Sequence, residues 1–171
     1  MCRWAPDGLP VCTIPGYQGW PGMASDGAGG VTLSWCDQRS GPHGTCMQRI
    51  AADGTMAFPA NGIELFPLDG DECGWIVPFA GDTVAAWIMQ FTPSDTMLLA
   101  QLVDASGGEV WPAPVTVVSE PDIYRPVAAR TGGDLVVAWT APGALGYDVF
   151  AQRIGPDGTV RWPAGGVPVC T

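Results

Sequence analysis

His43 is the only histidine of the chain, and it stands in the segment SGPHGT close to Ser40 and Asp37. A histidine beside a hydroxyl and a carboxylate is the residue set of a nucleophilic hydrolase, provided that the three groups lie within hydrogen-bond reach. The same three residue types are the ordinary content of a turn rich in Gly and Pro. The sequence therefore favours a solvated loop at His43, and we expect no catalytic residues.

An acidic cluster at Asp69, Asp71 and Glu72 in the segment LDGDEC offers a second kind of chemistry. Carboxylate oxygens on nearby residues are ligands that calcium prefers, but the run is too short for an EF-hand loop. A solvated acidic turn that protects a sheet edge is the favoured interpretation, and calcium binding is the alternative. No other cofactor is expected.

Six cysteines, at positions 2, 12, 36, 46, 73 and 170, include no CxxC pair, which argues against a zinc ribbon or a thioredoxin-type motif. Cys36 and Cys46 flank the turn-rich segment DQRSGPHGT between two strand-like runs. The sequence predicts a disulfide between them across a hairpin, with two small buried thiols as the alternative. An even number of cysteines favours an oxidising setting, extracellular or periplasmic.

Three aromatic residues are candidates for stacking on a sugar ring: Trp20, Trp75 and Tyr124. They stand outside the positions at which the other tryptophans recur. Those recurring positions are held by Trp35, Trp87 and Trp139, and by Trp4, Trp111 and Trp162. Recurrence at fixed spacing is typical of core residues, so we expect these tryptophans to be buried.

The formal charge of −10, without a single lysine, excludes partners that are bound through clustered basic residues, namely nucleic acid and anionic lipid. No apolar stretch approaches the length of a membrane span, and Met1 is not followed by a signal peptide. We expect an extracellular protein whose leader is absent from this chain.

The chain contains 24 Gly and 17 Pro, set between short apolar runs. This pattern predicts an all-β chain of short strands and tight turns, which would position the residues named above. The segments GGVTLSW, GDTVAAW and GDLVVAW end at Trp35, Trp87 and Trp139, which are 52 residues apart each time. A second phrase follows each of them: MQRIAADGTMAF, AQLVDASGGEVW and AQRIGPDGTVRW. Such a fixed period indicates a repeat architecture.

Each repeat is predicted to contain four antiparallel strands, in the third repeat at about 126–130, 134–139, 148–154 and 159–162. The Asp-Gly pairs predict tight hairpins. TVAAW and LVVAW are apolar at nearly every position, as expected for strands buried on both faces, whereas VTLSW alternates. The Arg of the QRI phrase, Arg49 and Arg153, is expected to pair with a nearby carboxylate or carbonyl.

The chain resembles the propeller-like repeats of large secreted bacterial proteins on the segments GGDLVVAW, YDVFAQRIGPDGTVRW and PAGGVPV. The resemblance implies a β-propeller-like fold with repeats at about 4–57, 58–110 and 111–161 and the start of a fourth unit at 162–171. It is specific for fold and transfers no catalytic residue. The second repeat departs most, with AQLVDASGG where the pattern has AQRI and an Asp-Gly pair.

Three blades are fewer than the four to eight of a closed propeller, so two apolar faces would stay open. Either the chain is a piece of a longer multi-blade protein, or copies self-associate, and we favour self-association. RWAPDGLPVCT at 3–13 and RWPAGGVPVCT at 161–171 share seven of eleven positions, so one copy of the segment is surplus. We therefore expect the ends to carry assembly, with the candidate residues Cys12, Cys170, Trp4 and Trp162.

The predicted function is thus a non-enzymatic extracellular structural module that self-associates through its terminal strands or open faces. A carbohydrate- or protein-binding propeller is the alternative. A glycan-acting hydrolase ranks below both, because none of the 17 acidic residues recurs in a defensible constellation.

Overall fold

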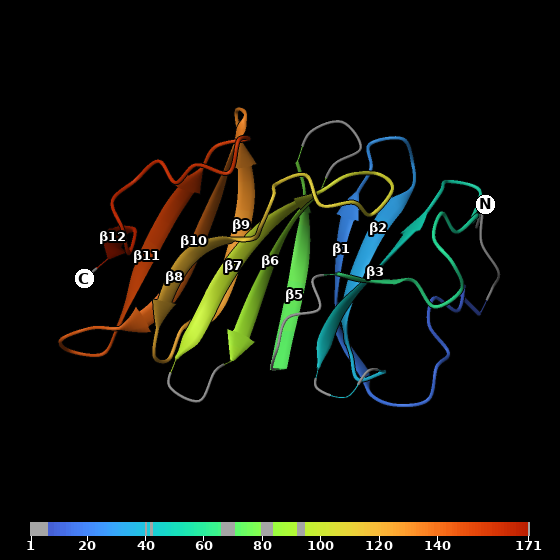
Figure 1. Cartoon of the computed structure of the whole chain (residues 1–171), viewed down its shortest axis with the longest axis horizontal. Helices are drawn as coiled ribbons and strands as arrows, with labels where there is room; N and C mark the ends of the chain where they lie inside the picture. Colours follow the sequence, from blue (N-terminus) through green and yellow to red (C-terminus); the bar gives the residue numbers. More distant parts are fainter. Residues whose placement is uncertain are drawn as a thin grey trace.

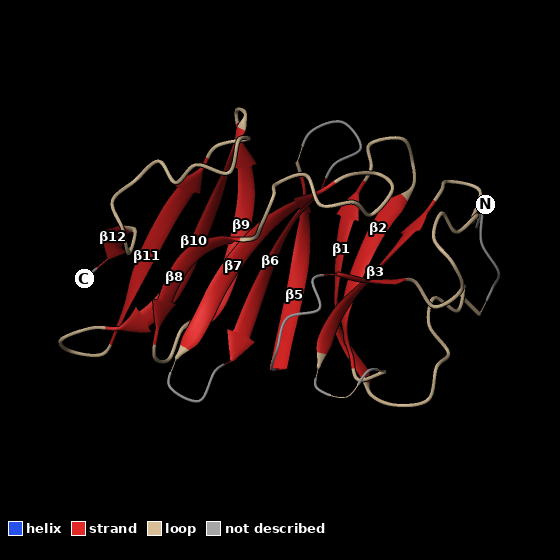
Figure 2. Ribbon diagram, in the orientation of Figure 1, coloured by secondary structure: helices blue, strands red, loops and turns tan. Residues whose placement is uncertain are grey.

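The computed structural model describes residues 7–39, 41, 43–65, 71–79, 84–91 and 95–170, with the backbone alone at 71–72 and 84–91. These residues form β-strands and turns and contain no helix (Figure 2). Within these ranges, accordingly, no helix is long and apolar enough to cross a membrane. The prediction of an all-β chain with antiparallel sheets is confirmed.

The strands form three four-stranded sheets, each built from consecutive strands paired with their neighbours. The first sheet contains β1 (Gln18–Ser25), β2 (Val31–Asp37), β3 (Gly44–Ile50) and β4 (Ile63–Leu65). The second contains β5 (Asp71–Pro78), β6 (Val84–Phe91), β7 (Thr96–Val103) and β8 (Val115–Glu120). The third contains β9 (Tyr124–Thr131), β10 (Asp134–Pro142), β11 (Tyr147–Ile154) and β12 (Val167–Cys170).

The three sheets stand in a row, with the first and the third at opposite ends of the molecule (Figure 1). Apolar side chains fill both spaces between neighbouring sheets. One buried cluster joins the second and third sheets and includes Leu98, Val117 and Trp139. Another joins the first and second sheets and includes Met47 and Ile76. The second sheet is therefore covered on both sides, and each end sheet on one.

A buried glutamine recurs at one position of each sheet: Gln48, Gln101 and Gln152 are each 0% exposed. The Gln48 side chain accepts a hydrogen bond from the Phe58 backbone N–H (3.0 Å) and donates to the carbonyls of Phe58 and Pro59. Gln101 and Gln152 bind the turns after their own strands in the same way. These turns are thus held by a side chain that satisfies otherwise unpaired backbone groups.

The fourth strand of the third repeat lies later than predicted. Residues 159–162 make only an isolated bridge, between Val160 and Ile154, and the strand that pairs with β11 is β12. The physical reason is the buried Gln152, which takes up the backbone groups of Trp162 and Pro163 that a strand would offer to its neighbour.

The two central strands of the first sheet, β2 and β3, have the same register as β10 and β11 of the third sheet, offset by 104 residues. Trp35 pairs with Cys46 in the first sheet, and Trp139 pairs with Phe150 in the third. Both sheets also carry a bulge in their first strand, where the residue before a proline has a positive φ: Trp20 (51°) and Arg125 (50°). In the second sheet Trp87 pairs with Ala100, which is one residue beyond the position equivalent to Cys46. The first strand of this sheet, β5, contains no bulge. The repeat that departs most in sequence therefore departs in register.

The predicted disulfide between Cys36 and Cys46 is wrong, because Cys36 bonds Cys73 of β5 and Cys46 is a buried free thiol. Cys36 lies opposite Thr45, whereas Cys46 lies opposite Trp35. Neighbouring residues of a strand point to opposite faces, so the two thiols lie on different sides of the first sheet. The disulfide instead joins the first sheet to the second across their interface.

Candidate functional site

The third sheet has one covered and one open face, and β10 shows the difference directly. Leu135, Val137 and Trp139 are 0%, 0% and 2% exposed, because they face the second sheet. The alternate residues Val136, Ala138 and Thr140 are half-buried on the opposite face. The prediction that this apolar strand is buried on both faces is therefore wrong for the single chain. Its sequence is that of a covered strand, but no other sheet of the described residues packs on its outer face.

The equivalent residues of the first sheet show what such a face looks like when it is covered. Through the 104-residue offset, Val136, Ala138 and Thr140 correspond to Thr32, Ser34 and Cys36. Those three are 5%, 0% and 0% exposed, because the second sheet packs on them. The residues occupy equivalent positions in the two sheets, and the difference in exposure comes from the neighbouring sheet, which covers this face only in the first sheet.

The first strand of the third sheet gives the clearest contrast. Val127 is 62% exposed and pairs with Ala138. Its equivalent by strand pairing is Gly22, which pairs with Ser34 and lies against the Trp75 side chain of the second sheet. Ala129 is likewise exposed where its equivalent Ala24 is 3% exposed. We call this open surface the third-sheet end face; it comprises Val127, Ala129, Val136, Ala138, Thr140 and Val149.

At the other end of the molecule, the outer face of the first sheet carries Val31, Leu33 and Trp35, which we call the first-sheet end face. Val31 and Leu33 are half-buried, where their equivalents Leu135 and Val137 in the third sheet are fully buried. The segment before β1 lies against this face, and between them is a cleft of about 260 Å³. Its lining is Val11, Cys12, Gln18, Gly19, Pro21, Leu33, Ser34 and Trp35.

A buried ion pair holds the segment before β1 against this face. The Asp37 carboxylate, at the end of β2, accepts hydrogen bonds from Trp35 Nε1 (2.8 Å) and Arg39 Nη2 (2.6 Å). Arg39 Nη2 also donates to the Asn61 carbonyl (2.7 Å) and lies 3.6 Å from Cys12 Sγ. The amide oxygen of Asn61 in turn accepts the Thr13 backbone N–H (2.9 Å). This cluster therefore links β2, the turn before β4 and the segment before β1.

The electrostatics of the cluster favour a structural role. Burial raises the pKa of the Asp37 carboxyl, but the hydrogen bonds from Arg39 and Trp35 outweigh burial and lower the pKa to about 2. Burial raises the pKa of the nearby Cys46 thiol to about 12. Because a thiol reacts as its thiolate, Cys46 is held in an unreactive form.

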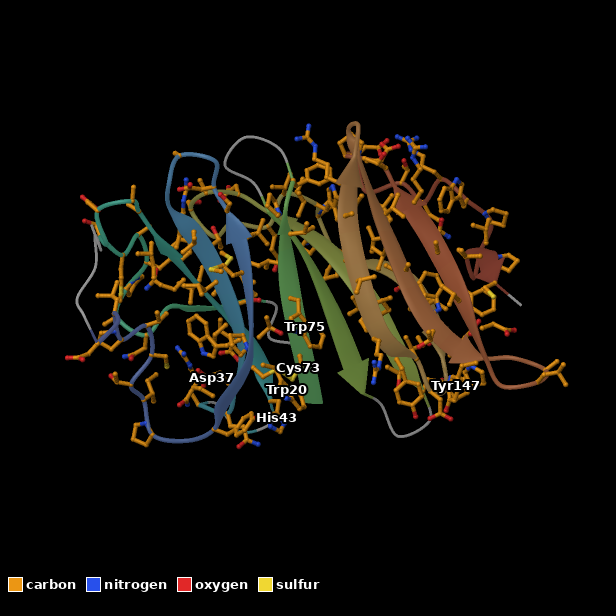
Figure 3. All side chains as sticks on the ribbon, turned by 180° about the vertical axis from the view of Figure 1, so that it is seen from behind. Trp20, Asp37, His43, Cys73, Trp75 and Tyr147 are labelled. Atoms are coloured by element: carbon orange, nitrogen blue, oxygen red, sulfur yellow. A yellow bond between two sulfur atoms is a disulfide. The ribbon has the colours of Figure 1, made fainter. Side chains whose placement is uncertain are left out.

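The three aromatic candidates for sugar stacking lie on the first strands of the three sheets: Trp20 on β1 and Trp75 on β5, both labelled in Figure 3, and Tyr124 on β9. Trp20 is 56% exposed at the bulge of β1, beside Tyr17 at 6.4 Å between ring centroids. Trp75 is half-buried between sheets, against Gly22. Tyr124 is 44% exposed at the start of β9, in the third sheet. No ring contact joins any two of these three aromatic side chains.

Tyr124 nevertheless lines a cleft of its own, at the edge of the third-sheet end face. The cleft has a volume of about 290 Å³ and is lined by Tyr124, Arg125, Thr140 and Tyr147. The two tyrosine rings meet edge to face, with 5.6 Å between centroids. Tyr147, which the sequence analysis did not single out, is 62% exposed. Its signal was the aromatic start of the phrase YDVF.

The other candidate sites are not assembled by the described residues. Asp37 is engaged by Arg39 and Trp35, His43 lies edge-on to Tyr17 at 5.5 Å, and Ser40 is outside the described residues. Of the candidate calcium ligands, Asp69 is outside the described residues, and Asp71 and Glu72 are described by backbone alone, at the start of β5. The described part of the chain holds no cluster of three or more metal-ligating side chains.

Three of the four candidate assembly residues, Cys12, Trp162 and Cys170, are described by the structure. Cys12 is a free thiol on the first sheet, and Cys170 is an exposed free thiol in β12 at the far end. Trp162 is half-buried, whereas its equivalents Phe58 and Trp111 are 9% and 4% exposed. Trp111 is covered because it packs beneath the Gly158 hairpin of the next sheet and donates from Nε1 to the Pro156 carbonyl (2.9 Å). Trp4 is outside the described residues.

Sequence reasoning found the repeated arginines but missed the cluster around Asp37. Arg153 Nε lies 2.5 Å from the Asp134 carboxylate, and Arg49 lies 3.9 Å from that of Asp26, so the predicted pairing is confirmed. Arg39 has no counterpart in the other repeats, so no recurrence marked it. Comparison of the chain with protein-family models, with curated proteins and with solved structures found no match.

Proposed function

We propose that this chain is a non-enzymatic structural module that self-associates by packing the third-sheet end face of one copy on the first-sheet end face of the next. The observation that carries the proposal is the 62% exposure of Val127, at a position that the second sheet covers in the first repeat. A soluble chain rarely leaves a contiguous apolar face uncovered, and such a face is typical of an interaction surface.

The proposed contact repeats a packing that the molecule already uses. In each internal junction, one face of a sheet lies against the opposite face of the next. The two end faces are the unused halves of that junction. Packing of unlike faces is heterologous, so it closes into a ring or continues as a filament. Two copies that close would give a ring of six sheets.

Trp162 supports the same arrangement. Phe58 packs near the Gly107 hairpin and Trp111 beneath the Gly158 hairpin, each in the following sheet. Trp162 is the next member of this series, and the described residues contain no following sheet that covers it. In the assembly, the equivalent hairpin is the one around Gly54 in the first sheet of the neighbouring copy, and Trp162 is buried beneath it.

In this proposal the sheets act as blades of a β-propeller-like ring. Two features support the finer description: each sheet has four antiparallel strands in chain order, and β5 contacts both β1 and β9, the first strands of the neighbouring sheets. The Cys36–Cys73 disulfide supports an oxidising, extracellular setting for the module.

The test is the substitution Val127→Asp, measured by light scattering coupled to gel filtration. The wild-type chain is expected to have a mass that is a multiple of 17.8 kDa at micromolar concentration. The aspartate would be buried without a partner at the junction, at a cost of about 3 kcal/mol or more, which weakens association at least about 100-fold. The variant should therefore elute as a monomer.

The matched control is Leu145→Asp, because Leu145 is fully exposed in the loop between β10 and β11. This control should assemble like the wild type, and circular dichroism should show that both variants are folded. A wild-type chain that is monomeric at micromolar concentration refutes the proposal. So does a Val127→Asp variant that assembles normally.

Carbohydrate binding is a second candidate function, favoured by the cleft of Tyr124, Arg125, Thr140 and Tyr147. Exposed aromatic rings stack on sugar rings, and a guanidinium donates hydrogen bonds to hydroxyl or carboxylate oxygens. Glycans that bind the wild type on an array should bind Tyr147→Ala at least about five-fold less tightly, since one stacking contact is lost. Trp20→Ala is the control and should bind normally. An array without hits removes this candidate.

A further inference from the structure

The segment before β1 has the sequence of the fourth strand of a sheet but pairs with no strand. Leu9, Pro10, Val11 and Cys12 correspond to Val167, Pro168, Val169 and Cys170, which form β12. The C-terminal copy pairs with β11, whereas residues 8–14 of the N-terminal copy are in no strand. The same short sequence thus appears twice, once paired and once unpaired.

The route from this segment into β1 copies the route from β8 into β9. Gly16 (φ 120°) and Asp122 (φ 59°), each after a proline, have positive φ, and so do Trp20 and Arg125 at the two bulges. The segment is therefore placed on the first sheet much as β8 is placed on the third. Val117 of β8 is buried with Trp139, and its equivalent Val11 lines the cleft beside Trp35.

β12, by contrast, is held loosely. It makes three register pairs with β11, whereas β8 makes five with β7, and each of the two pairings contains one irregularity. Val169 of β12 is 64% exposed, and its equivalent Val117 is 4% exposed. The paired copy of the segment is thus poorly covered, and the unpaired copy is already seated against an apolar face.

We infer that in the assembled protein residues 9–13 of one copy replace β12 on β11 of the neighbouring copy. This inference rests on the proposed function, because it requires the third-sheet end face of one copy to lie on the first-sheet end face of the next. In that packing the segment before β1 reaches the β11 edge as the fourth strand of its neighbour's sheet. Only one fourth strand fits there, so β12 leaves and the junction gains backbone hydrogen bonds.

Cys12 gives a direct test, because the exchange sets it opposite Val149, where Cys170 lies in the single chain. Residues directly opposite in antiparallel strands are close enough for a disulfide. In a background with Cys2→Ser, the double variant Val149→Cys/Cys170→Ser should form disulfide-linked multimers on a non-reducing gel after mild oxidation. A closed ring of two gives a dimer band, and a filament gives a ladder that starts at the dimer band. Adding Cys12→Ser should abolish that band.

A second variant tests whether β12 must leave. In Val149→Cys/Cys12→Ser, a disulfide between Cys170 and the new cysteine locks β12 on β11. This variant should lose assembly by light scattering under oxidising conditions and regain it when a reductant opens that bond. A locked variant that still assembles overturns the inference.

The outcomes separate the inference from the proposed function. Multimers in solution without the Cys12-dependent dimer band overturn strand exchange and leave packing of the end faces in place. A monomeric wild type with no such band overturns both. The dimer band together with loss of assembly in the locked variant establishes both.

Discussion

Replacing Cys36 and Cys73 together by alanine will lower the free energy of unfolding by about 4 kcal/mol. The disulfide closes a loop with a sequence separation of 37 residues, and the chain entropy that such a crosslink removes from the unfolded state is of this size. Chemical denaturation at one fixed protein concentration will show a lower midpoint, together with a steeper denaturant dependence because the unfolded chain exposes more surface.

The single variant Cys170→Ala is the matched control, since Cys170 is exposed and free. It should unfold like the wild type. Reduction of the wild type should reproduce most of the loss seen in the double variant. An unchanged midpoint in the Cys36/Cys73 double variant would show that the first two sheets are held together by packing alone.

Replacing Asp37 by asparagine should cost about 3 kcal/mol of stability at neutral pH. The Asp37 side chain is 0% exposed and that of Arg39 is 16% exposed, so the substitution leaves a largely buried guanidinium without its counter-charge. Trp35 Nε1 also loses its charged acceptor, and Arg39, which donates to the Asn61 carbonyl, loses the carboxylate that positions it. Denaturant titration at pH 7 measures the effect. Asp157→Asn, at an exposed hairpin, is the control and should change stability little.

The effect of Asp37→Asn on stability should also depend on pH. The pKa of Asp37 is lowered from an ordinary 3.8 to about 2, so its ionised form stabilises the fold above about pH 4. That stability, on the order of 2 kcal/mol, is lost as the pH falls from about 4 through 2. The difference in stability between the wild type and Asp37→Asn should therefore shrink across this window. A constant difference would mean that the charge of Asp37 plays no part.

The sequence was sufficient for the all-β class and the antiparallel sheets, because Gly, Pro and apolar runs recur at one period. It was insufficient for register. A shift of one residue moves every side chain to the other face, and the loop between β2 and β3 does not reveal which residues pair. Cys36 opposite Thr45, rather than Cys46, was enough to redirect the disulfide to another sheet.

The prediction of the fourth strand of the third repeat at 159–162 was wrong for a related reason. TVRW looks like a strand by its residue types, but Gln152 binds the backbone beside it from ten residues away. Such a side-chain contact has no periodic signature of its own. The glutamine itself recurs in every repeat, as Gln48, Gln101 and Gln152, and this recurrence is a signal from which a structural role could be predicted.

For the end sheets, the sequence predicted a conflict between the burial that the apolar strands require and the number of sheets available to cover them. The apolar pattern of β10 calls for cover on both faces, and the chain supplies cover on one. The sequence thus pointed to the ends without showing which residues form them. Asp37 was considered only beside His43, and its ion pair with Arg39 was missed, because a cluster that occurs once cannot be found by its repetition.

The buried glutamines have a consequence for how such a chain can change its length. Gln48, Gln101 and Gln152 each bind backbone groups ten or eleven residues further along, within their own sheet. Duplication or deletion of a whole sheet therefore leaves these contacts intact in the sheets that remain. The groups at the break that need a new neighbour are the sheet faces, the Cys36–Cys73 disulfide where it is cut, and tryptophans such as Trp111 that bond to the following sheet. Repeat number can therefore vary between descendants wherever a new neighbour replaces these contacts.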